Sequence, residues 1–100
     1  MNTYVIRRRQ AWQSPEELEQ VAGRSKEIAD SDFPQDIRWI RSYVIAEADG
    51  TLGSACIYEA SGPEAIRKHA ERVGMPADEI SEVGDTVVIR PDPVSEPAAS

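Results

Sequence analysis

The stretch IRWIRSYVIAEADGTLGSACIYEA, residues 37–60, decides the fold of this chain. It holds two runs rich in β-branched and aromatic residues, and between them lies Asp49-Gly50, a strong hairpin signal. We therefore expect residues 37–47 and 52–60 to form two antiparallel strands. The other predicted elements flank this hairpin on both sides.

A strand and a helix precede the hairpin. The run TYVIRRR, residues 3–9, begins with β-branched and aromatic residues and predicts a first strand. Ser14 and Glu17 form a capping-box signature around Pro15, which suits the first helical position. We expect the helix to run from this cap to Ala29.

A second helix follows the hairpin. Ser61 and Glu64 form another capping box, just ahead of the helical pattern PEAIRKHAERV at residues 63–73. Gly74 stands where a helix-ending glycine belongs, so the helix is expected to stop there.

The last predicted strand completes the domain. It is the run SEVGDTVVIR, residues 81–90, with a bulge expected at Gly84. The tail at residues 91–100 has three prolines and small polar residues and is expected to be disordered. The element order over residues 1–90 is β-α-β-β-α-β, the ferredoxin-like arrangement of an α+β domain. It predicts a four-stranded antiparallel sheet with both helices on one face.

Both faces of this sheet are predicted to carry large apolar side chains. In the strand at 37–47, alternation places on one face Ile40, Ser42 and Val44, and on the other Trp39, Arg41, Tyr43 and Ile45. An apolar sheet face that no helix covers is an association surface. We therefore expect a homodimer joined through the open sheet face, a dimeric α+β barrel. The alternative is that the long loops fold over that face.

The charge of the chain bears on its partners. Its 100 residues include 18 acidic and 11 basic side chains, a net charge of −7. Binding a phosphate backbone normally needs a net basic face, so no nucleic-acid partner is expected. The local exception is Arg7-Arg8-Arg9, and three arginines at the end of a strand usually form a solvated rim.

Cysteine content and hydropathy bear on the compartment. Cys56 is the single cysteine, so an internal disulfide is impossible. No run approaches the about 18 apolar residues of a membrane helix, and the N-terminus has no long apolar stretch before a cleavage site. We expect a cytoplasmic protein with no membrane partner.

Few residues can carry chemistry, and most lie in CIYEASGPEAIRKHA, residues 56–70. His69 lies on the apolar stripe of its helix, where it is either a core histidine with a hydrogen-bond partner or a metal ligand or proton-transfer group. A free cysteine in a strand, such as Cys56, is most often a small buried hydrophobic residue. Glu59 lies three positions later, on the opposite face of a regular strand, which counts against a Cys-Glu-His triad.

Among these residues, a divalent metal is best placed at His69 with carboxylates, because imidazole and oxygen ligands suit nickel, zinc and related ions. Asp78 and Glu79 are candidates, although a solvated turn is the commoner role for such residues. Arg41 lies in a strand that is apolar on both faces and needs an anionic partner, either a carboxylate across the dimer or an anionic small molecule.

Four motifs carry a resemblance to a known family: RWIRSY at 38–43, CIYEA at 56–60, a histidine late in the following helix, and ADEISEV at 77–83. Over residues 3–90 the chain resembles a small bacterial nickel-binding-protein-like family of unknown function. The resemblance implies a ferredoxin-like fold, a homodimer, and that Cys56, Glu59 and His69 occupy the family's recurring positions. The nickel-binding type has a second histidine one helical turn after the first, where this chain has Val73. Nickel would therefore need carboxylates or the second subunit to complete its ligands.

Three functions compete. The first is a dimeric binding protein that holds nickel, another divalent metal or a small ligand near His69, with no other cofactor. The alternative is a cofactor-independent enzyme of the monooxygenase or isomerase type, with His69 as general base and Tyr43 or Tyr58 orienting the substrate. The third is an interaction protein that uses its open sheet face. The candidate ligand-binding residues are Tyr43, Cys56, Tyr58, Glu59 and His69.

Overall fold

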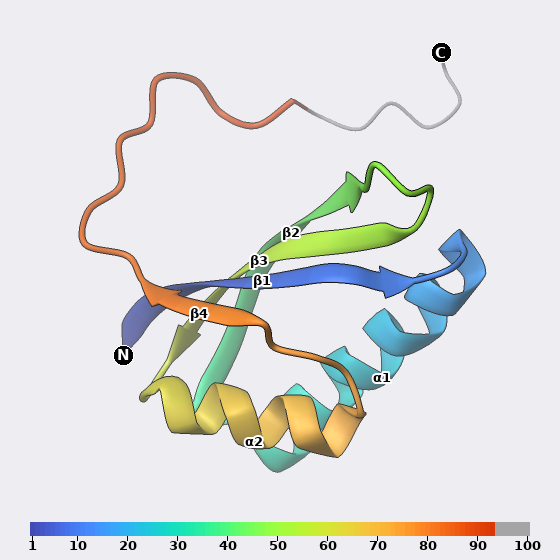
Figure 1. Cartoon of the computed structure of the whole chain (residues 1–100). Helices are drawn as coiled ribbons and strands as arrows, with labels where there is room; N and C mark the ends of the chain where they lie inside the picture. The colour runs from blue at the N-terminus through green and yellow to red at the C-terminus, as the bar shows by residue number, and fades with distance from the viewer. Residues whose placement is uncertain (94–100) are drawn as a thin grey trace.

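The six elements occur in the predicted order. The computed structural model describes residues 1–93. Its elements are β1 (Asn2–Trp12), α1 (Pro15–Asp32), β2 (Ile37–Ala46), β3 (Leu52–Ala60), α2 (Pro63–Val73) and β4 (Glu79–Glu82). The strands form one antiparallel sheet in the order β2-β3-β1-β4, and both helices lie on the same face of it (Figure 1). The predicted ferredoxin-like α+β fold is confirmed.

The hairpin of β2 and β3 closes at the turn that the sequence indicates. The Glu47 amide donates to the Thr51 carbonyl oxygen at 3.0 Å. Asp49 Oδ1 accepts from the Thr51 amide and from its hydroxyl, at 3.0 and 2.6 Å. Gly50 has φ of 89°, a left-handed conformation that glycine adopts without steric cost. The turn thereby fixes the register in which the two strands pair.

A bulge in β2 changes which side chains face the helices. Trp39 pairs with Tyr58 and Arg41 with Ile57, so Ile40 has no partner on β3. The extra residue puts Trp39 on the helix side of the sheet, against the core. The prediction that Trp39 shares a face with Arg41 was wrong, because the bulge shifts the alternation by one residue.

Both helices begin where the sequence predicts, but only one has the predicted cap. At the start of α1, Ser14 Oγ accepts a hydrogen bond from the Glu17 amide at 3.2 Å. At the start of α2 the capping box is absent, because Gly62 is the N-cap and makes no side-chain bond. Ser61 Oγ instead donates to Asp36 Oδ1 at 3.1 Å, which ties the helix start to the segment before β2.

The last strand departs most from the prediction. β4 spans four residues, Glu79–Glu82, rather than 81–90, and pairs with Tyr4–Arg7 of β1. Residues 83–93 contain no helix or strand, so the bulge predicted at Gly84 is also absent. The segment contains one glycine, two aspartates and two prolines, residue types that are depleted in strands.

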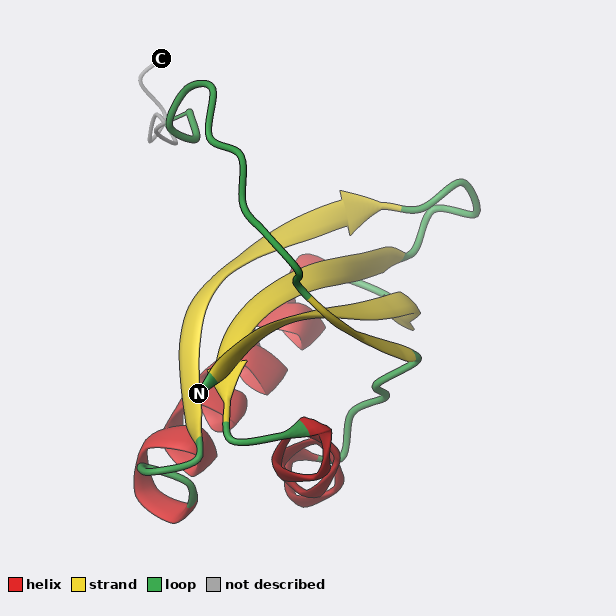
Figure 2. Cartoon of the chain, turned by 90° about the vertical axis from the view of Figure 1, so that its left-hand side faces the viewer, coloured by secondary structure: helices red, strands yellow, loops and turns green. Residues whose placement is uncertain are grey.

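The C-terminal segment, residues 83–93, leaves the sheet on the side opposite the helices (Figures 1 and 2). Asp92 Oδ2 accepts from the Tyr43 hydroxyl at 2.8 Å and lies 3.1 Å from Arg41 Nε. One contact of the tail with β2 is therefore polar. Of the tail predicted to be disordered, residues 94–100 lie outside the described part of the chain.

The core lies between the sheet and the two helices. Ile6 of β1, Tyr58 of β3 and Ile66 of α2 are each no more than 1 % exposed. Ala29 of α1 joins the same cluster, so each helix presents its apolar face to the sheet. Neither helix within residues 1–93 is long and apolar enough to cross a membrane.

Candidate functional site

A pocket lies between α1 and the helix side of the sheet. Its volume is about 250 Å³. Its walls are mostly apolar and include Trp12, Leu18, Val21, Trp39, Val44 and Met75. A concave, mostly apolar pocket with a few polar groups is the usual form of a small-ligand site.

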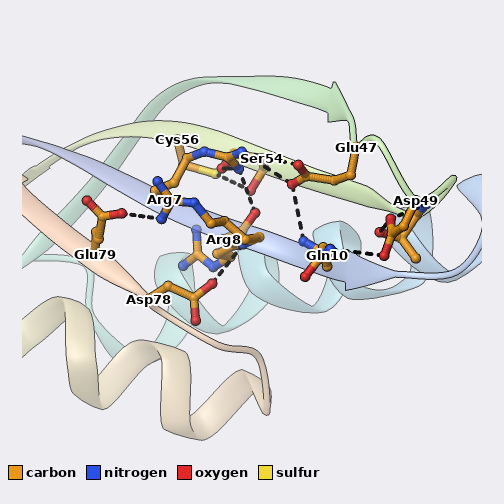
Figure 3. Close-up of polar contacts among 11 residues, drawn as sticks. Arg7, Arg8, Gln10, Glu47, Asp49, Ser54, Cys56, Asp78 and Glu79 are labelled. Atoms are coloured by element: carbon orange, nitrogen blue, oxygen red, sulfur yellow. Dashed lines mark hydrogen bonds and ion pairs between the residues drawn. The ribbon is translucent and has the colours of Figure 1, made fainter.

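Arg8 of β1 provides the positive charge in this pocket. Its side chain is 1 % exposed, and its Nε, Nη1 and Nη2 have no hydrogen-bond partner within residues 1–93. The guanidinium carbon lies 6.0 Å from the centroid of the Tyr58 ring, within cation–π range. Figure 3 shows the Arg8 side chain on the helix side of β1. Arginine stays protonated in proteins, so the pocket holds a permanent cation that no carboxylate of the described chain neutralises.

The alternation of β1 directs Arg8 inward. Every second residue from Tyr4 to Arg8 is buried. Arg7 points to the other face and pairs with Glu47 at 3.2 Å, and Arg9 is exposed. The prediction that all three arginines form a solvated rim was wrong for Arg8. The signal that would have found it is the period of two, which continues from the apolar residues into the arginines.

Gly53 of β3 lets the two central strands approach closely beside Arg8. A Cβ at Gly53 would stand 2.5 Å from the Arg8 carbonyl oxygen, a distance that side chains do not tolerate. Arg7 Nη1 donates to that same oxygen at 2.9 Å and to the Ser54 carbonyl at 3.1 Å (Figure 3). Together with Glu47, these bonds fix the backbone from which the Arg8 side chain extends.

Further polar residues line the same pocket, among them Ser25, Cys56 and Tyr58. Ser25 of α1 is 2 % exposed, and its Oγ has no partner in the described residues. Cys56 Sγ donates to Ser54 Oγ at 3.4 Å. Burial raises the pKa of Tyr58, and the Arg8 charge opposes that rise. Two of the candidate residues named from the sequence, Cys56 and Tyr58, therefore lie together in this pocket.

His69 of α2 lies outside the pocket lining. It is 0 % exposed, and its Nε2 lies 2.9 Å from the Ser25 carbonyl oxygen. Because a carbonyl only accepts, Nε2 carries the hydrogen. The ring meets Phe33 and Tyr58 edge to face, with centroids 5.8 and 5.9 Å apart. Burial lowers the pKa of His69, the Ser25 bond opposes this, and the Arg8 charge lowers the pKa further. A neutral imidazole is therefore the favoured form.

The remaining candidates lie on the opposite face of the sheet. The Tyr43 hydroxyl bonds to Asp92, and Glu59 lies 3.6 Å from Arg38 in an exposed ion pair. The structure does not bring Tyr43 or Glu59 near Cys56 and Tyr58. Arg41, for which the sequence predicted a carboxylate across the dimer or an anionic small molecule, pairs with Asp92 of its own chain.

A divalent metal does not fit the residues around His69. Among residues 1–93 no three side chains of His, Cys, Asp or Glu gather closely enough to hold an ion. His69 Nε2 bonds to the Ser25 carbonyl, and its buried Nδ1 has no partner within residues 1–93. The candidate carboxylates serve Arg9 instead: Asp78 Oδ2 accepts from its amide at 2.7 Å, and Glu79 pairs with its guanidinium.

The fold and the pocket define the class: a small ferredoxin-like α+β domain with a mostly apolar pocket, into which faces a buried arginine that has no partner within residues 1–93. A protein-family model described as nickel responsive protein SCO4226-like matches residues 4–83, so the chain belongs to this family. The resemblance drawn from the sequence is thereby confirmed.

One solved structure supports the same fold. The crystal structure of SCO4226 from Streptomyces coelicolor A3(2) is similar, with a TM-score of 0.65 and 20 % sequence identity. The match covers 85 % of this chain and 99 % of that one, and at this identity the likeness shows the fold alone. A comparison with curated proteins found no match.

Proposed function

We propose that this protein binds a small organic ligand in the pocket between α1 and the sheet. One observation carries the proposal: a mostly apolar pocket of about 250 Å³ is lined by Arg8, a buried cation without a partner in residues 1–93. An unpaired buried charge destabilises a fold, so packing alone does not account for it. Buried polar groups are rarely left unsatisfied in native structures, and a functional role is one explanation where they are.

Nickel binding at His69 has weaker support. The family's description refers to nickel, and His69 is the only histidine of this chain. Val73 stands one helical turn later, where a second imidazole would complete a chelating pair. Nickel or zinc titration of metal-free protein beside His69→Ala tests this function. We expect no metal binding that depends on His69, and micromolar binding lost in the variant would reverse the order of the two proposals.

The enzyme alternative has weaker support. A base at His69 would need to reach the pocket, but His69 is not among the residues that line it, and its ring packs against Phe33 and Tyr58. Tyr43, one of the two residues proposed to orient a substrate, bonds to Asp92 on the other face. Binding without chemistry is therefore the function that we favour.

We also propose that the protein is a cytoplasmic homodimer that associates through its open sheet face. Val5, Ile45 and Ile57 give this face half-buried apolar side chains. In the adjacent C-terminal segment, Val87, Val88 and Ile89 are between 69 and 80 % exposed. A second copy would cover such side chains. Sedimentation equilibrium tests the proposal: we expect a dimer that Ile57→Lys dissociates, and a wild-type monomer at high concentration would contradict it.

A pocket-filling variant tests the ligand site. Ala22 of α1 lines the pocket, so Ala22→Trp should fill it, whereas Gln20→Trp adds the same ring to an exposed position of the same helix. A set of acidic, basic and neutral compounds is screened by thermal shift, and binding of the neutral dye Nile red is followed by its fluorescence. We expect ligands that stabilise the wild type and the Gln20→Trp control but not Ala22→Trp. A wild type that binds nothing, or an Ala22→Trp variant that binds equally well, would overturn the proposal.

A further inference from the structure

Resting on the pocket proposed above, we propose that its ligand is a small monovalent carboxylate with an apolar body, and that Arg8 binds the carboxylate group. The apolar body lies between Trp39 of β2 and the α1 residues Leu18 and Val21, which line the same pocket.

The charge of Arg8 calls for an anion. Burial does not neutralise a guanidinium, because its pKa is too high for it to lose its proton inside a protein. Its N–H groups lie in one plane and match a carboxylate with two parallel hydrogen bonds. Within residues 1–93 nothing accepts these bonds, although the side chain is only 1 % exposed. The unused donors therefore point to an acceptor from outside the described chain.

The walls and the volume limit the class of anion. One unpaired positive charge matches one negative charge, and a dianion such as a phosphate monoester would bring a second charge against mostly apolar walls. A volume of about 250 Å³ holds roughly eight groups the size of a water molecule, which suits a ligand of about eight to ten non-hydrogen atoms. Hexanoate and phenylacetate have this size and charge.

Ser25 is the second donor to the carboxylate. Its Oγ is buried without a partner in the described chain and lines the same pocket as Arg8. His69 holds Ser25 in position, because its Nε2–H donates to the Ser25 carbonyl at 2.9 Å.

Glu19 is the rival partner for Arg8 within the chain. It lies on α1, lines the same pocket and is exposed, and it forms no ion pair with Arg8 in the described structure. If Glu19 neutralised Arg8 in solution, the pocket would need no anionic ligand. Glu19→Gln removes this rival without changing the shape of the side chain, and separates the two cases.

Calorimetric titration of the full chain tests the proposal. The probes are hexanoate and phenylacetate, each beside its primary amide, which has nearly the same shape but no charge. We expect the wild type to bind each acid at least tenfold more tightly than its amide. Arg8→Met should abolish this preference, and Arg9→Met, the same change at the exposed arginine next to it, should retain it. Glu19→Gln should bind the acids as well as the wild type does, or more tightly.

Each contrary result has its own meaning. Equal binding of acids and amides would overturn the carboxylate assignment and leave the ligand pocket standing. Nile red binding without acid binding would do the same. Acid binding that appears only in Glu19→Gln would show that Glu19 already neutralises Arg8, which also overturns the assignment. If neither the dye nor any acid or amide binds, the proposed function fails with the inference. The acid–amide comparison uses the wild type, so it stands even where Arg8→Met fails to fold.

Discussion

Two consecutive arginines of β1 show how differently the two faces of the sheet are built. On the open face, Arg7 pairs with Glu47 at 3.2 Å and donates to the carbonyls of Arg8 and Ser54. On the helix face, Arg8 is more deeply buried and has no partner within residues 1–93. The chain can thus pair an arginine one position away. The unpaired charge lies in the pocket at which we propose that a ligand binds, and a break with local rules of stability is expected at such a site.

The largest effect should come from Gly53, the residue at which β3 passes close to the backbone of β1. Its α-carbon faces the Arg8 carbonyl so closely that a Cβ would stand 2.5 Å away. Gly53→Ala should force the central strands apart and lower the free energy of unfolding by about 3 kcal/mol, as overpacking does. Urea denaturation measures the change. Gly23→Ala is the matched control, because nothing lies within 4 Å of that position, and it should stabilise α1 by about 1 kcal/mol. Equal stability of Gly53→Ala and wild type would show that the strands are not in close contact.

Removing each arginine should change stability in opposite directions. Arg7→Met leaves Glu47, whose side chain is 14 % exposed, without its ion-pair partner and with the Gln10 amide as its remaining donor. The free energy of unfolding should fall by about 1–3 kcal/mol. Arg8→Met replaces an unpaired buried cation by an apolar chain of similar length and should raise that free energy by about 1 kcal/mol in ligand-free protein. Denaturant unfolding of both variants measures this. A loss at Arg8 as large as the loss at Arg7 would mean that Arg8 has a structural partner.

The pH dependence of stability should report on the helix face. Burial lowers the pKa of His69 from its ordinary value of 6.5. The unfolded chain therefore binds more protons than the folded chain just below pH 6.5, and stability falls as the pH is lowered through that range. His69 is the only histidine, so in His69→Gln the melting temperature should depend less on pH between pH 7.5 and 5.5 than it does in the wild type. An unchanged slope in the variant would assign the titration to another group.

The smallest effect should come from an exposed pair on the open face. Glu59 Oε1 lies 3.6 Å from Arg38 Nη1, and the two side chains are 35 and 74 % exposed, respectively. Such pairs contribute little, so Glu59→Gln should change the free energy of unfolding by less than about 0.5 kcal/mol. Carboxylate binding should be unaffected, because Glu59 lies on the face away from the pocket. A loss of ligand binding in this variant would place the ligand site on the open face of the sheet and contradict its assignment to the pocket.

The local signals in the sequence predicted most of the fold. Asp49-Gly50 and the cap at Ser14 act over a few residues, and both appear as predicted. The predictions fail where a distant partner decides. Ser61 bonds to Asp36 across the domain instead of capping α2. The bulge at Ile40 is fixed by the pairing of β2 with β3, and it reverses the face of Trp39.

The site was only partly visible in the sequence. Cys56 and Tyr58 were named as candidates, and they line the pocket. Arg8 was missed because a run of three arginines is usually interpreted as a solvated rim. Every second residue of β1 from Tyr4 onward is buried, however, and Arg8 is one of these residues. Composition describes a run as one unit, whereas a strand sends neighbouring side chains to opposite faces. Arg8 has no partner within residues 1–93, but this depends on how the chain folds and could not be predicted from the sequence.

The most direct measurement follows the arginine side chains themselves. In proton–nitrogen spectra of ¹⁵N-labelled protein, the Nε–H resonances of Arg7 and Arg8 can be assigned from Arg7→Met and Arg8→Met. We expect saturating phenylacetate to shift the Arg8 resonance and to leave that of Arg7 in place, whereas phenylacetamide shifts neither. An Arg8 resonance that does not move while phenylacetate binds would contradict the claim that this arginine is the anion site of the pocket.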